Sequence, residues 1–426
     1  MDRGQLPMDV LADIVVRLPA ESVCCIQCVS KALLDMVDHH SFVTRHTGLL
    51  VATNAVHQVP QLMFFTRSYV PYPGTTGEHY VAFQSIKFDG STSALTRGNF
   101  AISVTPLDRF ERAIYRVTFV FCNLIGFISN RSGFFLINPL KGEVLRLPSD
   151  NPQRPNSEVL GTYYGMGFDN ITNTYKIVCV TGIYSTVPET WFTQILVLGT
   201  SSWRDISSVP PCALSTQRRV CAYGDTHWLT LCDLRTCYII SFDFKKEEFY
   251  CLPHPVLQSS NDHLNLFVHL HLLTLRGSLA MVDTSSSTGS TMNMDIWMLK
   301  DYDKKEWTRD YSINLEMPPN LHPKFGATDF TCDQWEHGIF FKNFRQIPTF
   351  FLDLRCLSIC PVIFGSGDFT NLFSYTGSLI SLKDYRNSVE AETGSGSLKS
   401  YGKLIEGDAQ GLSLSEKHVL RRISFI

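Results

Sequence analysis

The sequence lacks an excess of basic residues and has few charges of either sign. Charged residues make up 18% of the 426 positions, and 37 Lys and Arg oppose 40 Asp and Glu, which gives a formal net charge of −3. Nucleic-acid-binding domains usually carry a pronounced basic patch, so we expect no nucleic acid among the partners. The sequence is instead 44% hydrophobic and 12% aromatic. This composition excludes global disorder and favours β-sheet, in which aromatic residues are enriched.

Segments for export or membrane insertion are also missing. The first residues, MDRGQLPMDVL, contain no continuous apolar stretch of the kind found in signal peptides. The longest apolar stretch, residues 117–128, is interrupted by Asn123 and is shorter than the ~20 residues of a membrane span. The 13 cysteines show no paired framework, since the CxxC pair of Cys25 and Cys28 lies in an expected helix. We therefore expect a soluble protein that is not secreted and works in a reducing compartment, the nucleus or the cytoplasm.

Motifs for catalysis and for cofactor or metal binding are absent as well. The sequence contains no GxxxxGK[ST], no HExxH, no GxSxG and no EF-hand loop. Three histidines are the best metal candidates, but without a carboxylate partner they favour a polar strand face: His263, His269 and His271. Four acidic residues lie among lysines and arginines and predict a solvated hairpin turn rather than a glycosidase pair: Asp301, Asp303, Glu306 and Asp310. The sequence thus predicts no catalytic residue, no metal and no cofactor.

A helical periodicity runs from residue 6 to about residue 46. Apolar residues recur at positions 10, 11, 14, 15 and 18 and form one wide stripe on a helix that begins near Pro7 and stops at Pro19. A second helix is expected from Glu21 and a third, short one around residues 33–37. A three-helix module of ~40 residues seldom folds without support. Its apolar stripes are therefore expected to pack on the rest of the chain or on another protein.

From Leu62 onward the pattern changes to short apolar runs separated by Gly, Pro, Asn and Asp. Residues 134–148 (FFLINPLKGEVLRLP) and 239–253 (IISFDFKKEEFYCLP) share one layout and each predict a β-hairpin. A glycine recurs before or within a strand at 41 to 61 residue intervals, at Gly126, Gly167, Gly224, Gly277 and Gly338. Strand repeats at such a period predict propeller blades. Four tryptophans within these repeats are expected in the core of the blades: Trp203, Trp228, Trp297 and Trp307.

The repeat predicts an all-β domain from about residue 60 to 385, with six blades. Five blades are marked by glycines, and a sixth is assembled from both ends of the domain. In that closure, residues 61–65 or 81–88 are expected to share a sheet with SLISL (378–382), because ring closure removes exposed sheet edges. The linker-like stretch 283–295 is expected to join two strands of one blade. Residues 386–426 are rich in Ser and Gly and predict a flexible polar tail.

Residues 6–48 resemble an F-box. The matching residues are Leu6, Pro7, Asp9, Leu11, Ile14, Arg17, Leu18, Pro19, Ser22, Cys28, Val29, Lys31 and Phe42. The sequence departs from the F-box pattern at Leu33, Cys25 and Gln27. The downstream strings LINP, LRLP, YGMGFDNITNTYKIV, SSWRDI, GDTHWL and RGSLAMV occur in order and resemble the plant F-box-associated interaction domain, a kelch-like β-propeller type.

These resemblances imply a non-catalytic substrate receptor of an SCF (Skp–cullin–F-box) ubiquitin ligase. Residues 1–50 would dock a Skp-family adaptor, and through it cullin and RING subunits, while residues 60–385 would capture a protein target. The matched positions imply these adaptor-binding residues: Leu6, Pro7, Leu11, Ile14, Leu18, Pro19, Val29 and Phe42. The physics agrees, since an exposed helical module with apolar stripes suits docking to a partner. An alternative is a propeller enzyme or a glycan-binding lectin whose helices merely cap the β domain.

Target recognition is expected in loops that interrupt the regular repeat. Three intervals mix proline with aromatic or histidine residues: 181–192, 252–264 and 316–325. The side chains expected to contact the target are Tyr184, Trp191, Phe192, His254, His263 and His322. Ordinary solvated connections remain the alternative for each interval. We expect the target to be a protein, whether glycosylated or not.

Overall fold

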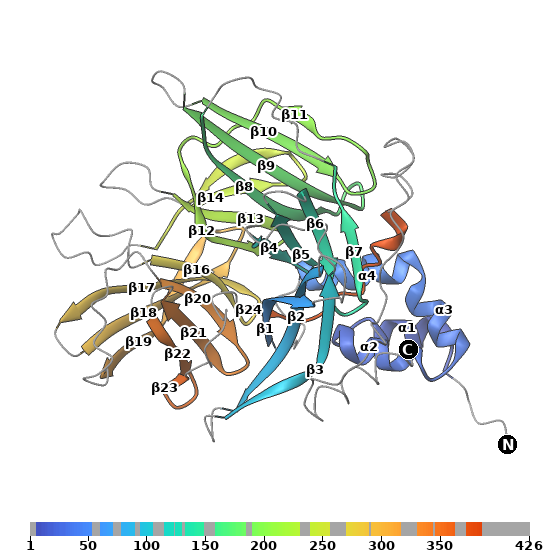
Figure 1. Ribbon diagram of the computed structural model, residues 1–426, viewed down its shortest axis with the longest axis horizontal. Helices are drawn as coiled ribbons and strands as arrows, with labels where there is room; N and C mark the ends of the chain where they lie inside the picture. Colours follow the sequence, from blue (N-terminus) through green and yellow to red (C-terminus); the bar gives the residue numbers. More distant parts are fainter. Residues whose placement is uncertain are drawn as a thin grey trace.

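A helical part and a larger β part make up the computed structural model (Figure 1). The structure describes residues 6–52, 60–70, 78–89, 94–104, 115–122, 124–129, 133–148, 158–184, 190–230, 239–255, 270–288, 291–316, 330–343, 346–362 and 372–385. The predicted tail at 386–426 therefore lies outside the described residues. Within the described chain the helices end at Ala52 and the first strand begins at Gln61.

The N-terminal part contains four helices, one more than the sequence predicted. They are α1 (Met8–Val15), α2 (Ala20–Gln27), α3 (Lys31–Asp38) and α4 (His40–Ala52). Pro7 and Pro19 directly precede α1 and α2, where a missing N–H costs nothing. The hydroxyl of Ser30 caps α3 by accepting a hydrogen bond from the Leu33 amide at 3.2 Å. The sequence missed α4 because its apolar residues do not follow one clear helical stripe, and the β part supplies the surface on which it packs.

The β part consists of six four-stranded antiparallel sheets. Blade 1 combines β1 (Gln61–Val70), β2 (Glu78–Asp89) and β3 (Ala94–Val104) with β24 (Phe373–Tyr375). Blade 2 contains β4 (Tyr115–Phe121), β5 (Leu124–Ser129), β6 (Gly133–Asn138) and β7 (Glu143–Arg146). Blade 3 contains β8 (Glu158–Asp169), β9 (Thr174–Tyr184), β10 (Thr190–Val197) and β11 (Arg204–Ile206).

The other three blades follow in chain order. Blade 4 contains β12 (Leu214–Ala222), β13 (Asp225–Thr230), β14 (Ile239–Asp243) and β15 (Glu248–Leu252). Blade 5 contains β16 (Leu270–Leu275), β17 (Ser278–Thr288), β18 (Thr291–Asp301) and β19 (Glu306–Glu316), and blade 6 contains β20 (Phe330–Trp335), β21 (Gly338–Asn343), β22 (Gln346–Asp353) and β23 (Ser358–Val362). One strand of each blade contacts the corresponding strands of other blades around the axis. These innermost strands are β4, β8, β12, β16, β20 and β24. The predicted six-bladed propeller is therefore confirmed.

The ring closes as predicted from both ends of the domain, but through a different segment. Strand β24 pairs with β1, with Tyr375 opposite Gln61, whereas the predicted closing segment 378–382 forms no strand. The positive φ of Gly377, 92°, turns the chain out of the sheet directly after β24. We call residues 378–382 the strap. It is buried and held from blade 2, because Asn138 Nδ2 donates to the carbonyls of Ser378 (3.0 Å) and Ile380 (2.7 Å).

Two tryptophan side chains connect neighbouring blades by hydrogen bonds at the Leu-Pro ends of the predicted hairpins. Trp203 Nε1 donates to the Pro148 carbonyl at 3.0 Å, and Trp307 Nε1 donates to the Pro253 carbonyl at 2.8 Å. Both hairpins form as predicted, as β6–β7 and β14–β15. Among the other repeat tryptophans, Trp228 is fully buried and Trp297 is half-buried. The shared layout of the two hairpins therefore reflects a repeated contact between blades.

Two further expectations about segments of the β part are modified by the structure. The linker-like stretch 283–295 does join two strands of one blade, but most of it is itself strand, since β17 and β18 extend to Thr288 and from Thr291. Cys212, in the connection between β11 and β12, is disulfide-bonded. The expectation of no paired cysteines is therefore wrong, because sequence spacing alone does not show which cysteines the fold brings together. The ten other described cysteines form no disulfide.

Candidate partner-binding surfaces

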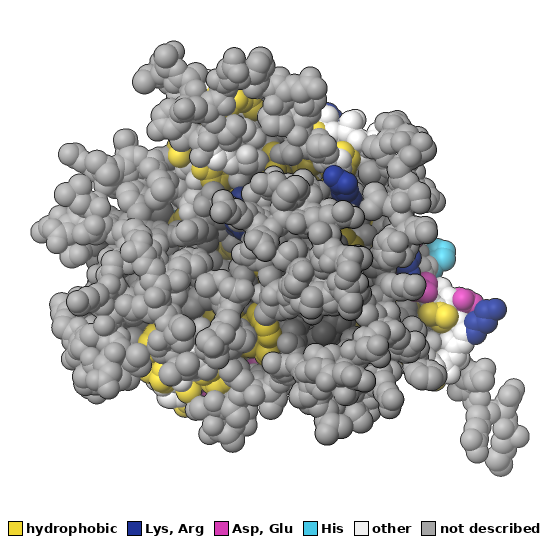
Figure 2. All heavy atoms as spheres, viewed as in Figure 1, with side chains coloured by type: hydrophobic (Ala, Val, Ile, Leu, Met, Phe, Trp, Pro, Cys, Tyr) yellow, Lys and Arg dark blue, Asp and Glu magenta, His cyan; other side chains and the backbone are white. Residues whose placement is uncertain are grey.

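Exposed apolar side chains concentrate on the N-terminal helices. Nine large hydrophobic residues are exposed in the part of the chain that the structure describes, and six of them lie between residues 6 and 34. We call these six the helical apolar surface: Leu6, Met8, Val10, Ile14, Val29 and Leu34, with exposed fractions from 39% to 74%. Figure 2 shows hydrophobic side chains beside acidic and basic ones on this projecting part of the molecule. Such a concentration indicates a surface for a protein partner.

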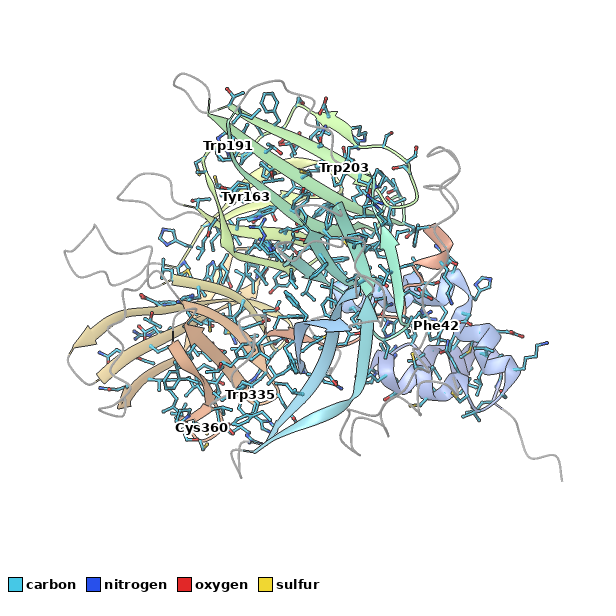
Figure 3. All side chains as sticks on the ribbon, in the orientation of Figure 1. Phe42, Tyr163, Trp191, Trp203, Trp335 and Cys360 are labelled. Atoms are coloured by element: carbon cyan, nitrogen blue, oxygen red, sulfur yellow. The ribbon has the colours of Figure 1, made fainter. Side chains whose placement is uncertain are left out.

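The amphipathic pattern of α1 explains why this surface stays exposed. Val15 and Val16 are buried at the end of α1, whereas Ile14 is half exposed. Of the eight predicted contact residues, four are exposed and three are half-buried: Leu6, Pro7, Ile14 and Val29, then Leu11, Leu18 and Pro19. Phe42 is 5% exposed and points into the interior of the helical part (Figure 3). It packs in one cluster with Val23 and Leu379, so its side chain lies in the core of the helical part, and its contact with an adaptor stays a prediction.

The helices pack firmly on the propeller. The cluster around Phe42 includes Leu379 of the strap and the half-buried Leu140 of blade 2. The hydroxyl of Tyr175 on β9 donates to Thr47 Oγ1 of α4 at 3.0 Å, and Gln61 Nε2 at the start of β1 donates to Glu21 Oε1 at 2.6 Å. Apolar packing and hydrogen bonds therefore fix the helical part at one place on the ring.

All these contacts lie on one face of the propeller. Within a blade the strands alternate in direction, so the joins between first and second and between third and fourth strands lie at the same end. We call that end the helix-bearing face, because the turns at Leu140, Gly224 and Gly377 contact the helices there. The described strand ends that lead into the joins between second and third strands, and into the connections between blades, lie on the opposite face. The described helices therefore pack on the face of the ring that lies away from these strand ends.

The described ends of the three intervals predicted to contact a target lie at the opposite face, while residues 185–189, 256–264 and 317–325 lie outside the described residues. Interval 181–192 spans the join between β9 and β10, while 252–264 and 316–325 leave the ends of β15 and β19 toward the next blade. Trp191 and Phe192 nevertheless belong to β10 and are half-buried. The Trp191 ring lies 6.0 Å from the ring of Tyr163 (Figure 3). This packing gives Trp191 a role in the blade.

The structure describes only some of the remaining residues that were expected to contact a target. Tyr184 ends β9, and half-buried His254 lies just after β15, with its Nδ1 2.7 Å from the Pro255 carbonyl oxygen. His263 and His322 lie outside the described residues. The described ends of the three intervals therefore lie at one face, and no cluster of their named side chains is seen among the described residues.

A buried polar cluster lies between blades 4 and 5. The carboxylate of Asp225 accepts hydrogen bonds from the hydroxyls of Tyr250 (3.1 Å) and Tyr302 (3.0 Å). Burial, with a smaller contribution from the charge of Asp243, raises the pKa of Asp225 to about 6. Lys305 Nζ lies 3.9 Å from the centre of the Tyr302 ring. The polar groups of this cluster form hydrogen bonds and ring contacts with one another, which favours a structural role over a catalytic one.

A second buried polar site surrounds Lys176 of β9. Its Nζ contacts Asp169 Oδ2 at 2.8 Å and Glu247 Oε1 at 2.9 Å, which joins blade 3 to blade 4. Burial acts to raise the pKa of Asp169, but hydrogen bonds from Lys176, Thr172 and the Ile171 amide hold it down to about 2. Among the described residues no group of three or more His, Cys, Asp and Glu side chains is placed to hold a metal ion. Within the same described part, no helix is long and apolar enough to cross a membrane.

Comparisons with known proteins agree with both parts of this architecture. Residues 4–45 match the family described as F-box domain, and residues 93–335 match the family described as F-box associated beta propeller domain. An F-box protein of Arabidopsis thaliana is 26% identical over 362 residues, covering 78% of this chain and 78% of that protein. An F-box/kelch-repeat protein of the same plant is 24% identical over 334 residues, covering 78% of this chain and 82% of that protein.

Similarity to solved structures is weaker. An oligogalacturonate lyase from Vibrio parahaemolyticus aligns with a TM-score of 0.36 and 8% identity, covering 72% of this chain and 87% of that one. A similarity at that level carries no argument about activity. The match to the F-box-associated propeller family, by contrast, spans more than half of the chain, and its strands are the blades described above. The chain therefore belongs to the F-box proteins that carry an F-box-associated β-propeller domain.

Proposed function

We propose that this protein is the non-catalytic, target-binding subunit of an SCF ubiquitin ligase. A Skp-family adaptor docks on the helical apolar surface and connects the protein to the cullin and RING subunits. The opposite face of the propeller captures a protein target, which is then ubiquitinated in the nucleus or the cytoplasm. One observation carries the proposal: six exposed apolar residues gather on the F-box helices and nowhere else in the described part of the chain at that density.

The architecture supports a division of labour between the two faces. The F-box is anchored on the helix-bearing face through Phe42, Thr47 and the strap, so its outward side is left for the adaptor. The connections between blades lie on the other face, where loops can vary without disturbing the ring. Adaptor and target therefore do not compete for the same surface.

The test is a substitution in the centre of the helical apolar surface. Ile14 is 50% exposed, so Ile14→Asp leaves the F-box core intact but places a charge into the adaptor interface. An unpaired charge in a desolvated interface costs several kcal/mol, so the affinity for the adaptor should fall at least about 100-fold. Val209, 43% exposed on the opposite face, offers the matched control Val209→Asp. Undiminished co-purification of a Skp adaptor with Ile14→Asp, or equal losses in both variants, contradicts the proposal.

A further inference from the structure

Two exposed cysteines lie three positions apart at the end of α2. Cys25 belongs to the last turn of the helix, and Cys28 is the residue that follows its end. Both thiols are free and both residues are exposed. Val29, which at 74% is the most exposed residue of the helical apolar surface, follows directly in the chain. A change in the covalent state of these two thiols would therefore act at the helical apolar surface.

The backbone places the two cysteines on the same side of the chain. The Cys28 amide donates to the Cys25 carbonyl at 3.2 Å, and the Val29 amide donates to the Ile26 carbonyl at 3.0 Å. Each bond joins a residue to the third residue before it, as in a 3₁₀ turn, where side chains three positions apart lie above one another. The rise of ~1.5–2.0 Å per residue separates their Cα atoms by about 5–6 Å. A disulfide needs about 4.4–6.8 Å between Cα atoms, so this pair can be bridged.

The thiol of Cys28 points back along the helix. Its Sγ donates to the Cys24 carbonyl oxygen at 3.7 Å, so the sulfur lies toward the preceding turn, from which Cys25 projects. Cys24 itself is half-buried beside the apolar cluster around Phe42, and burial raises the pKa of its thiol to about 11. Because the thiolate is the reactive form of cysteine, burial disfavours reaction at Cys24. The three neighbouring cysteines thus contain one exposed pair and one protected thiol.

We propose that Cys25 and Cys28 form a dithiol–disulfide pair that exchanges with glutathione and regulates docking of the adaptor. The proposal rests on the proposed function, because it names a regulation of the same helical apolar surface. The thiolate of one cysteine attacks glutathione disulfide, which gives a mixed disulfide and releases one glutathione. The thiolate of the other cysteine then attacks the protein sulfur of the mixed disulfide and releases the second glutathione. Two protein thiols are oxidised, the two glutathione thiols take up their protons, and reduced glutathione reverses both steps.

The bridge changes the turn that carries Val29. When the Cys28 sulfur bonds to Cys25, it gives up its hydrogen bond to the Cys24 carbonyl, and the residue that follows it is displaced. Val29 is one of the residues predicted to contact the adaptor. The contact of a buried valine side chain is worth at least about tenfold in affinity. We therefore expect the oxidised protein to bind the adaptor at least about tenfold more weakly than the reduced protein.

The first measurement maps the bond in the full chain by mass spectrometry. Tryptic cleavage after Arg17 and Lys31 gives one peptide that contains all three cysteines of α2 and its end. Iodoacetamide should label this peptide at every cysteine in the reduced protein, but only at Cys24 after treatment with glutathione disulfide. Full labelling after this treatment, a label at Cys25 instead, or a glutathione that stays attached to the peptide overturns the proposal.

The second measurement compares the affinity for a Skp adaptor before and after oxidation. Glutathione is removed before the adaptor is added, so that only the thiols of this protein are oxidised. The double variant Cys25→Ser with Cys28→Ser should show the same affinity with and without the treatment. The control Cys251→Ser removes an exposed thiol of β15 and should keep the full response. Dithiothreitol should restore the affinity of the oxidised, unchanged protein.

The outcomes separate this inference from the proposed function. An oxidised protein with unchanged affinity for the adaptor, or a double variant that responds as strongly as the unchanged protein, overturns the proposal. Failure of the reduced, unchanged protein to bind the adaptor refutes the proposed function. Adaptor binding by a reduced protein that forms no disulfide between Cys25 and Cys28 refutes this inference alone.

Discussion

The substitution Asn138→Asp tests how the strap is held. The Asn138 side chain is fully buried, and its Nδ2 donates to two strap carbonyls, those of Ser378 and Ile380. Aspartate has almost the same shape but has no donor, and its charge would face two carbonyl oxygens. Two lost hydrogen bonds cost about 1 kcal/mol each. The charge lowers the free energy of unfolding further, by at most about 4 kcal/mol at pH 7. If keeping the buried carboxylate charged cost more than this, the carboxyl group would take up a proton instead.

We therefore expect Asn138→Asp to lower the free energy of unfolding by about 4 kcal/mol at pH 7, as measured by urea denaturation. Burial raises the pKa of the introduced carboxyl, so the charge penalty exists above that pKa and disappears as the pH falls through it. Asn138→Ala removes the same two donors without a charge and is the control. The difference between the two variants should thus narrow between pH 7 and pH 5. A loss below about 1 kcal/mol, or a difference that does not depend on pH, would refute the role given to Asn138.

Two further predictions concern the blades. Gly167→Ala should destabilise the fold by more than about 3 kcal/mol, because the added Cβ would lie 2.0 Å from Phe244 Cδ2 and 2.4 Å from the Gly224 carbonyl oxygen. The control is Gly142→Ala, where the Cβ meets open space and the φ of 64° should cost only about 1 kcal/mol. Thermal unfolding of the two variants measures this difference in stability. Burial lowers the pKa of His227 to about 4, so its contribution to the stability of the fold is complete above pH 6.5 and decreases by about 3 kcal/mol as the pH falls to 4. The raised pKa of Asp225 has the opposite effect on stability over the same pH range. Asp225→Asn should therefore lose stability more steeply than the unchanged protein as the pH falls over this range. If the free energies of unfolding of the two proteins change in parallel with pH, the opposing effect given to Asp225 is wrong.

The repeated part of the fold was predictable because its local sequence agrees with its local structure. The hairpins at 134–148 and 239–253 combine β-forming runs with charged turns, and both form. The marker glycines meet two different physical needs. Gly224 and Gly277 have φ of 86° and 79° in turns, whereas Gly167 leaves no room for a Cβ. A recurring glycine therefore predicted the blades without showing which of these needs it serves.

The errors arise where distant parts of the chain meet. SLISL was expected to close the ring, but the turn at Gly377 directs it between the helices and blade 2, and the shorter β24 closes the ring instead. Phe42 matches an F-box position, and it is buried in a cluster that includes Leu379, which lies more than 300 residues away in the chain.

The strap has a consequence for the synthesis of the chain on the ribosome. The F-box helices emerge first, but their apolar cluster is completed only by Leu379, and the ring closes only when β24 can pair with β1. A nascent chain therefore carries its adaptor-docking helices for most of translation without their final packing partner. A small helical module without such support is marginally stable. Chains that end before residue 379 lack both a closed ring and a finished F-box core, so abortive products should be poor competitors for the adaptor.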